Sequence, residues 1–143
     1  MYRSESAFKQ SLLKALRDRG CLCVCIESHE TSRGIPDIYV LGKGKGCDGW
    51  IELKNMKDGA WEPKKGQWKI DWRSGQQVWA YEYYVRMNKD KCTLTVAALS
   101  EGYIIIPMTS VREDGYVKED EVLKCKTMEV LVGNVIEWLE EMY

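Results

Sequence analysis

The prediction of the fold starts from the stretch Trp50–Asn55, WIELKN. Its apolar and polar residues alternate with the period of two that is typical of a half-buried β-strand. This period places Glu52 and Lys54 on one face of the strand and Ile51 and Leu53 on the other. Two interpretations of the charged pair are open: an exposed ion pair worth about 0 to 1 kcal/mol, or part of a reactive site.

The segment before this strand predicts a second strand that pairs with it. IPDIYVL (35–41) reads as a strand, and the glycine-rich GKGKGCDG (42–49) reads as a short turn. Strands joined in this way form a hairpin and lie about 5 Å apart. We therefore expect Asp37 to lie close to Glu52 and Lys54.

A further strand is predicted by CLCVCIE (21–27), in which Cys21, Cys23 and Cys25 fall on one side. Cysteine behaves as a small buried hydrophobe at such positions. Because the chain has no CxxC pair to suggest a zinc site, we expect reduced, buried thiols.

Helical patterns flank these strands. Residues 4–20 predict an amphipathic helix with a serine cap and a glycine stop, and its apolar stripe is Phe8, Leu12, Leu13 and Leu16. Residues 55–73 lack periodicity and predict a long loop. Residues 75–88 predict a second helix, 93–99 and 103–108 predict strands, and 127–142 predict a terminal helix.

The order helix, three strands, helix, two strands, helix indicates an α/β fold with a mixed central sheet. A length of 143 residues fits one domain spanning 1–143. No apolar run approaches the roughly 20 residues that a membrane span requires. The charged N-terminus is also unlike a secretory signal. We expect a soluble, cytoplasmic protein without a membrane partner.

The net charge of -1 argues mildly against a protein that binds chiefly nucleic acid. The charge is unevenly distributed, however. Residues 54–73 contain six basic and three acidic side chains, whereas residues 112–143 contain four basic and nine acidic ones. A basic surface can therefore exist within an acidic protein.

Two carboxylates and an ammonium group converge if the predicted hairpin forms. Mg²⁺ favours a few oxygen ligands with positions left for water and phosphate. A lysine beside the ion can orient or deprotonate the attacking water, or offset charge that develops on a phosphate. Asp37, Glu52 and Lys54 thus suit the hydrolysis of a phosphodiester.

The motif GIPD (34–37), followed by a hairpin and by ELK (52–54), resembles the PD-(D/E)XK nuclease superfamily. Within it, the chain is most similar to small VRR-NUC and Holliday-junction-resolvase-like nucleases. Those families add a glutamate in the first helix, matched by Glu5, and a glutamine at the start of a later helix, matched by Gln76. The resemblance covers residues 4–107 and implies a restriction-endonuclease-like core, with a mixed sheet flanked by helices.

Carried over by position, the resemblance implies that Asp37, Glu52 and the backbone carbonyl of Leu53 bind Mg²⁺ or Mn²⁺. Lys54 would position or activate water.

Two further residues receive a catalytic role from the resemblance, and each has a simpler explanation. Glu5 would bind a second metal or the metal's waters, but an acid in the first helical turn also suits the helix dipole. Gln76 would steady the lysine or the DNA backbone, yet glutamine is ordinary at a helix start. Gln77 takes its place if the helix register differs by one residue.

The expected DNA contacts come from two polar segments. The interleaved tryptophans and lysines of 55–73 suit single-stranded or splayed DNA, although the tryptophans can also pack on the body of the protein. Two interpretations of His29 remain open: it is a general base, or it is a solvated loop residue without a catalytic role. The predicted DNA-binding residues are Ser32, Arg33, Lys57, Lys64, Lys65, Lys69 and Arg73.

The sequence thus predicts a Mg²⁺- or Mn²⁺-dependent DNA endonuclease. By resemblance it acts on branched DNA such as a Holliday junction, as a homodimer, with the terminal helix 127–142 either at the dimer interface or in the core. A linear-duplex, flap or restriction-type nuclease is an alternative with the same chemistry. An inactive module that binds nucleic acid or protein is the alternative from another class.

Overall fold

The computed structural model describes residues 2–26, 35–44, 47–56, 61–70, 72, 93–107, 110, 112 and 114–140. The helices in this part of the chain are α1 (Glu5–Asp18), η2 (Glu119–Glu121) and α4 (Met128–Glu140). The strands are β1 (Leu22–Cys25), β2 (Ile38–Leu41), β3 (Asp48–Asn55), β4 (Trp61–Glu62), β5 (Gln67–Lys69), β6 (Thr93–Ala98), β7 (Tyr103–Pro107), β8 (Tyr116–Lys118) and β9 (Leu123–Cys125).

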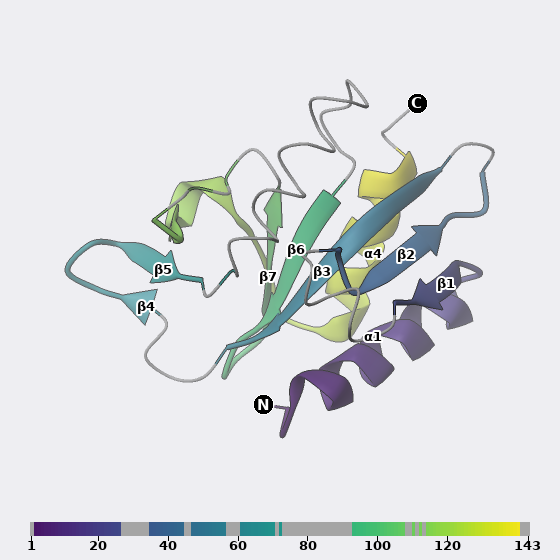
Figure 1. Cartoon of the computed structure of the whole chain (residues 1–143), viewed down its shortest axis with the longest axis horizontal. Coiled ribbons are helices and arrows are strands. Elements are labelled where there is room, and N and C mark those ends of the chain that lie inside the picture. The colour runs from purple at the N-terminus through teal and green to yellow at the C-terminus, as the bar shows by residue number, and fades with distance from the viewer. Residues whose placement is uncertain are drawn as a thin grey trace.

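A six-stranded mixed sheet forms the centre of the molecule, in the order β1-β2-β3-β6-β7-β9 (Figure 1). The β3–β6 pair is parallel, and all other neighbours are antiparallel. The predicted α/β class with a mixed central sheet is confirmed, as is the hairpin of β2 and β3. In the hairpin, Gly42 N donates to Cys47 O at 2.7 Å and closes the turn.

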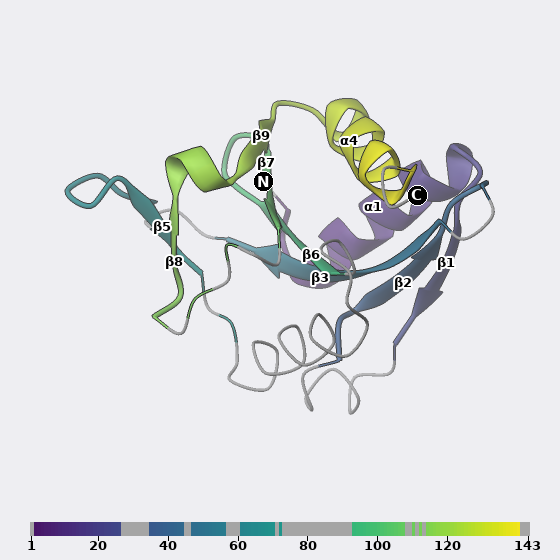
Figure 2. The same cartoon turned by 90° about the horizontal axis from the view of Figure 1, so that it is seen from above.

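Both helices pack on one face of this sheet (Figure 2). Alternation along β3 directs Ile51 and Leu53 into the core beneath them, where both are fully buried. The helices contribute Phe8, Leu12, Leu13 and Leu16 from α1 and Leu131, Val132, Val135 and Leu139 from α4. Burial of each large aliphatic side chain contributes about 1.5 to 3 kcal/mol.

The first helix begins and ends as the sequence predicts. Ser4 Oγ accepts a hydrogen bond from Ala7 N at 3.1 Å, which caps the helix. Gly20 follows the last turn with φ of 92°, a value that glycine adopts without strain.

Two glycines allow a paired test of the packing around α4. A Cβ added at Gly49 would lie 2.4 Å from Trp138 of α4, whereas one added at Gly133 would meet nothing within 4 Å. Gly49→Ala should therefore lower the melting temperature. Gly133→Ala, within the helix, should raise the free energy of unfolding by about 0.5 to 1 kcal/mol. Thermal denaturation of both variants checks this, and equal shifts would contradict the packing.

The prediction of one long loop over 55–73 is wrong. Within this range, β4 and β5 form a hairpin, and β5 pairs with β8 to complete a second sheet in the order β4-β5-β8. The sheet buries Trp68 and Val117 against Ile104 and Ile106 of β7. Its strands are only two or three residues long, too short to show a period in the sequence.

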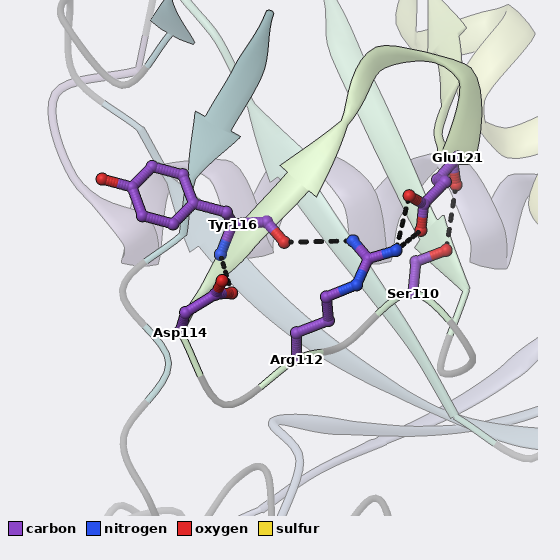
Figure 3. A network of polar contacts seen from close by, with 5 residues as sticks. All are labelled: Ser110, Arg112, Asp114, Tyr116 and Glu121. Carbon is purple, nitrogen blue, oxygen red and sulfur yellow. Dashed lines mark hydrogen bonds and ion pairs between the residues drawn. The ribbon is translucent and has the colours of Figure 1, made fainter. Parts of the chain in front are cut away.

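Strands β8 and β9 and helix η2 are not anticipated by the sequence analysis. A polar network ties the chain before β8 to the end of η2 (Figure 3). Arg112 Nη2 donates to both carboxylate oxygens of Glu121, at 2.6 and 2.8 Å, and Ser110 Oγ donates to the Glu121 carbonyl at 3.2 Å. Paired geometry of this kind fixes orientation as well as charge.

The predicted terminal helix is confirmed as α4, and its apolar residues show which of its two interpretations holds. Leu131, Val135 and Leu139 are buried in the core, so this face of α4 is not available to a dimer. Val130 is 45% exposed and Trp138 is half-buried. The predicted helix 75–88 lies outside the described residues.

The prediction of a buried row of cysteines on the first strand is wrong in part. Cys21 is buried, Cys23 is half-buried and Cys25 is exposed. The reason is the position of β1 at the end of the sheet, which leaves it a neighbour on one side only. None of the five described cysteines forms a disulfide.

Within the described ranges, no helix is long and apolar enough to cross a membrane.

Candidate active site

The face of the central sheet opposite the helices carries Asp37, Glu52 and Lys54. The register pairs Ile38 with Ile51, and both of these side chains point into the helical core. The next pair along the ladder is Asp37 and Glu52, and successive residues point to opposite faces. The hairpin therefore brings the two carboxyl groups together, as the sequence predicts.

Asp37 is held in place by the backbone of both neighbouring strands. Its Oδ2 accepts a hydrogen bond from Leu53 N at 2.8 Å, and its carbonyl accepts one from Ile26 N at 3.0 Å. The ladder position opposite Leu53 is Pro36, just before β2 begins, and the Asp37 side chain supplies the acceptor for the Leu53 amide there. The aspartate is thus part of the sheet's hydrogen bonding as well as of the site.

Glu52 is a buried carboxyl group, only 4% exposed. Burial, the negative charge of Asp37 and a hydrogen bond between the two carboxyl groups raise the pKa of Glu52 to about 9. Glu52 therefore keeps its proton at neutral pH. Like charges arranged in this way are typical of functional sites.

Lys54 gives the pair a positive neighbour. Its Nζ lies 3.9 Å from Glu52 Oε1, and both side chains are mostly buried. The lysine charge lowers the pKa of Glu52, against the larger effects of burial and Asp37. Glu52 and Lys54 therefore lie on the same face of β3 as parts of one mostly buried site. The simpler interpretation, an exposed surface pair, is wrong.

Glu5 contributes to this site from the start of α1. Asn55 Nδ2 donates to Tyr2 O at 3.1 Å, which holds the beginning of the helix against the end of β3. From there the negative charge of Glu5 raises the pKa of Glu52 further, although its own side chain is exposed. Glu5 is therefore electrostatically coupled to the carboxyl pair.

Thr95, which the sequence analysis missed, lies beside the pair, and Trp72, predicted only as one of the tryptophans of 55–73, is bonded to it. Thr95 of β6 is next to Glu52 in the parallel register and is buried. Trp72 Nε1 donates to Thr95 Oγ1 at 3.1 Å, with the indole also buried. Both side chains are therefore buried next to the strand position that Glu52 occupies. No local motif marks them, since Thr95 and Trp72 meet only in the folded chain.

The donor set of the pair suits a hard divalent cation. A cation held between Asp37 and Glu52 would offset the repulsion that raises the pKa of Glu52. The described residues contain no group of three or more His, Cys, Asp or Glu side chains placed to hold a metal. Two carboxylates and a backbone oxygen nonetheless fit Mg²⁺, which keeps several of its waters.

Three of the four predicted DNA-binding lysines, Lys64, Lys65 and Lys69, lie in the small second sheet. Lys64 and Lys65 are in the turn between β4 and β5, and Lys65 and Lys69 place their ammonium groups 4.0 and 4.6 Å from the centre of the Tyr116 ring. The β4–β5 hairpin projects to the side away from β1 and β2 in both views (Figures 1 and 2). The ammonium groups of Lys65 and Lys69 therefore lie over the Tyr116 ring of this second sheet.

Other predicted site residues lie outside the described ranges: Gln76, Gln77, His29, Ser32, Arg33, Lys57 and Arg73.

A pocket of about 440 Å³ opens on the helical side of the sheet. It is lined by β7, η2 and α4, including Ile105, Asp120 and Trp138. Because Ile105 faces the helices, the pocket and the carboxyl pair lie on opposite faces of the sheet.

A scan against models of protein families and a search of curated proteins give no match to this chain.

Proposed function

We propose that this chain is a metal-dependent DNA endonuclease of the PD-(D/E)XK type, which hydrolyses phosphodiester bonds. The observation that supports it best is the buried Glu52 carboxyl group beside half-buried Asp37, with the Lys54 ammonium 3.9 Å from Glu52. A purely structural site has no reason to bury a carboxyl group beside a second one that repels it, since each raises the cost of ionising the other.

Asp37, Glu52 and the carbonyl of Leu53 would hold Mg²⁺ or Mn²⁺. A bound divalent ion lowers the pKa of its water and offsets charge on the phosphate. The surrounding residues prepare this site. The Leu53 amide orients the Asp37 carboxylate, while Trp72 and Thr95 are buried on the side of β6. In a drier site, each charge acts more strongly on the reacting phosphate.

Lys54 would act on the phosphate and the attacking water from the same face. Its Nζ can donate hydrogen bonds to both, and the neighbouring Glu52 carboxylate limits where the ammonium can lie. Positioning of this kind accounts for a large part of the rate of phosphoryl-transfer enzymes.

Branched DNA as substrate and a homodimer as the active form are parts of this proposal that come from the resemblance.

The test is a cleavage assay on a four-way junction and a linear duplex of the same sequence, with Mn²⁺, Mg²⁺ or EDTA. The expected result is metal-dependent, paired cutting of the junction, lost in Lys54→Ala. Cutting of both substrates would keep the chemistry and discard the junction preference. Cutting of neither, with DNA binding retained, would overturn the enzyme assignment.

Glu5 allows a test of electrostatic support from α1. Glu5→Ala should lower the cleavage rate by about 10-fold to 100-fold without abolishing it, as loss of an outer partner of a metal site does. Its matched control is Glu129→Ala, which removes the acidic residue in the first turn of α4. Single-turnover kinetics check both variants. Equal rates for them would reduce Glu5 to a helix-dipole residue.

A further inference from the structure

The outer edge of the central sheet is formed by β1, whose apolar side chains are exposed. Leu22 is 68% exposed and Val24 is 53% exposed, and Leu41 on the paired strand is 38% exposed. The register pairs Leu22 with Leu41 and Val24 with Tyr39, so these four side chains share one face. They lie on the face that carries Asp37 and Glu52, because Ile38 and Val40 between them point into the helical core.

No described strand pairs with the outer edge of β1, and its backbone directs hydrogen-bonding groups toward that edge. Ile26 N donates to Asp37 O, so Ile26 and Val24 direct their backbone groups toward β2. Cys23 and Cys25, which alternate with them, direct theirs outward. An exposed contact from α1 agrees with this direction, since Arg17 Nη2 donates to Cys23 O at 3.2 Å.

Natural proteins protect such edges with lysine, proline, bulges or very short strands, because a bare edge pairs with other chains. The β1 sequence Leu-Cys-Val-Cys carries no charge and no proline. Its protection among the described residues is its length of four residues and Arg17, which is held by one exposed hydrogen bond that a partner strand can replace.

We propose that β1 pairs with β1 of a second copy of this chain, antiparallel and about a two-fold axis at Val24. A two-fold axis perpendicular to the sheet requires opposed residues to share a face. With Val24 opposite Val24 of the partner subunit, Cys23 lies opposite the partner's Cys25. The outward backbone groups of both residues then pair, giving four hydrogen bonds.

The side chains match as well as the backbone does. Leu22 lies opposite the partner's Ile26, and the two valines meet at the axis, so apolar groups face apolar groups. No like charges within the strand are brought together. The chain is therefore its own best partner at this edge. A contact of four residues is small beside a standard interface, so we expect reversible association at micromolar concentrations.

The role of this dimer in DNA cleavage rests on the proposed function. The pairing of the two β1 strands does not. It makes one continuous sheet with both carboxyl pairs on the same side. Strands lie about 4.8 Å apart and residues rise about 3.4 Å along a strand, which places the two sites about 20 to 25 Å apart. Two such sites on one surface can reach two strands of a branched DNA.

The test is the mass of the protein in solution, measured by sedimentation from about 1 to 200 µM without DNA or metal. Wild type should shift from monomer to dimer, and Val24→Lys should stay monomeric, since it sets two ammonium groups together at the axis. Val130→Lys is the matched control, because Val130 of α4 is similarly exposed at 45%. It should dimerise like wild type.

A second readout fixes the register. Mild oxidation should join Cys23 to Cys25 of the partner subunit, a bond that peptide mapping detects and that Cys25→Ser removes. A wild type that is monomeric at 200 µM, or a Val24→Lys dimer of unchanged affinity, would overturn the proposal. Neither the sedimentation result nor the disulfide mapping depends on cleavage, so these experiments test the dimer independently of the nuclease assignment.

Discussion

Glu52→Gln is expected to abolish cleavage and yet to stabilise the protein. The wild-type carboxyl group is buried beside Asp37, and its pKa is raised to about 9. Glutamine keeps the shape of the side chain and cannot ionise. It should therefore remove the cost of keeping this carboxyl group protonated at a pH where the unfolded chain would ionise it. It also removes a metal ligand, so we expect at least a 100-fold loss of cleavage rate, on the order of the several kcal/mol that metal ions contribute.

The gain in stability should depend on pH in a definite direction. Folded Glu52 keeps its proton to higher pH than the unfolded chain, whose carboxyl ionises near its model value of 4.5. Below that value the folded protein has its full stability. Between about pH 4.5 and 9 the folded state holds more protons, so the free energy of unfolding falls as pH rises, by up to about 1 kcal/mol per pH unit.

Melting temperatures at pH 5, 7 and 9 in EDTA check this prediction. Wild type should lose about 2 to 4 °C for each kcal/mol, and Glu52→Gln should show a shallower slope. Glu129→Gln, an exposed carboxyl in the first turn of α4, is the control and should keep the wild-type slope. Identical slopes in wild type and Glu52→Gln would contradict the burial of an ionisable pair.

Asp37→Ala should also abolish cleavage, with little change in stability. The substitution removes the acceptor for the buried Leu53 amide, which costs about 1 to 3 kcal/mol. It also removes the negative charge that raises the pKa of Glu52, and this relief offsets the loss. Cleavage should fall at least about 100-fold because one of the two carboxylate ligands is gone.

Cleavage rates and urea denaturation of Asp37→Ala check both halves of this prediction. The control is Asp18→Ala, which removes an exposed carboxylate that pairs with Lys14 at 2.8 Å. It should retain full activity. Unchanged cleavage by Asp37→Ala would remove the whole assignment of the site.

The hairpin and its site could be predicted because they depend on local order. A period of two, a glycine-rich turn of fixed length and the positions of Asp37 and Glu52 set the register before any tertiary contact is known. The first helix was equally predictable, since Ser4 and Gly20 mark its ends.

The second sheet and the exposure of the side chains of β1 could not be predicted in this way. Strands β4, β5 and β8 are too short for a pattern, and they form because Trp68 and Val117 pack on β7. Which strand lies at an edge depends on the pairing of distant segments, so the alternation of cysteines alone suggested a buried row. Likewise, lysines that suggested a DNA surface lie against Tyr116.

The central claim is that Asp37 and Glu52 form the metal site of a hydrolase, and Mn²⁺ binding tests it most directly. Titration calorimetry at pH 8 on wild type, Asp37→Ala and Asp18→Ala compares the site with an exposed carboxylate. We predict binding by wild type and Asp18→Ala, with loss in Asp37→Ala. Equal binding by all three proteins, or binding by none, would contradict the account.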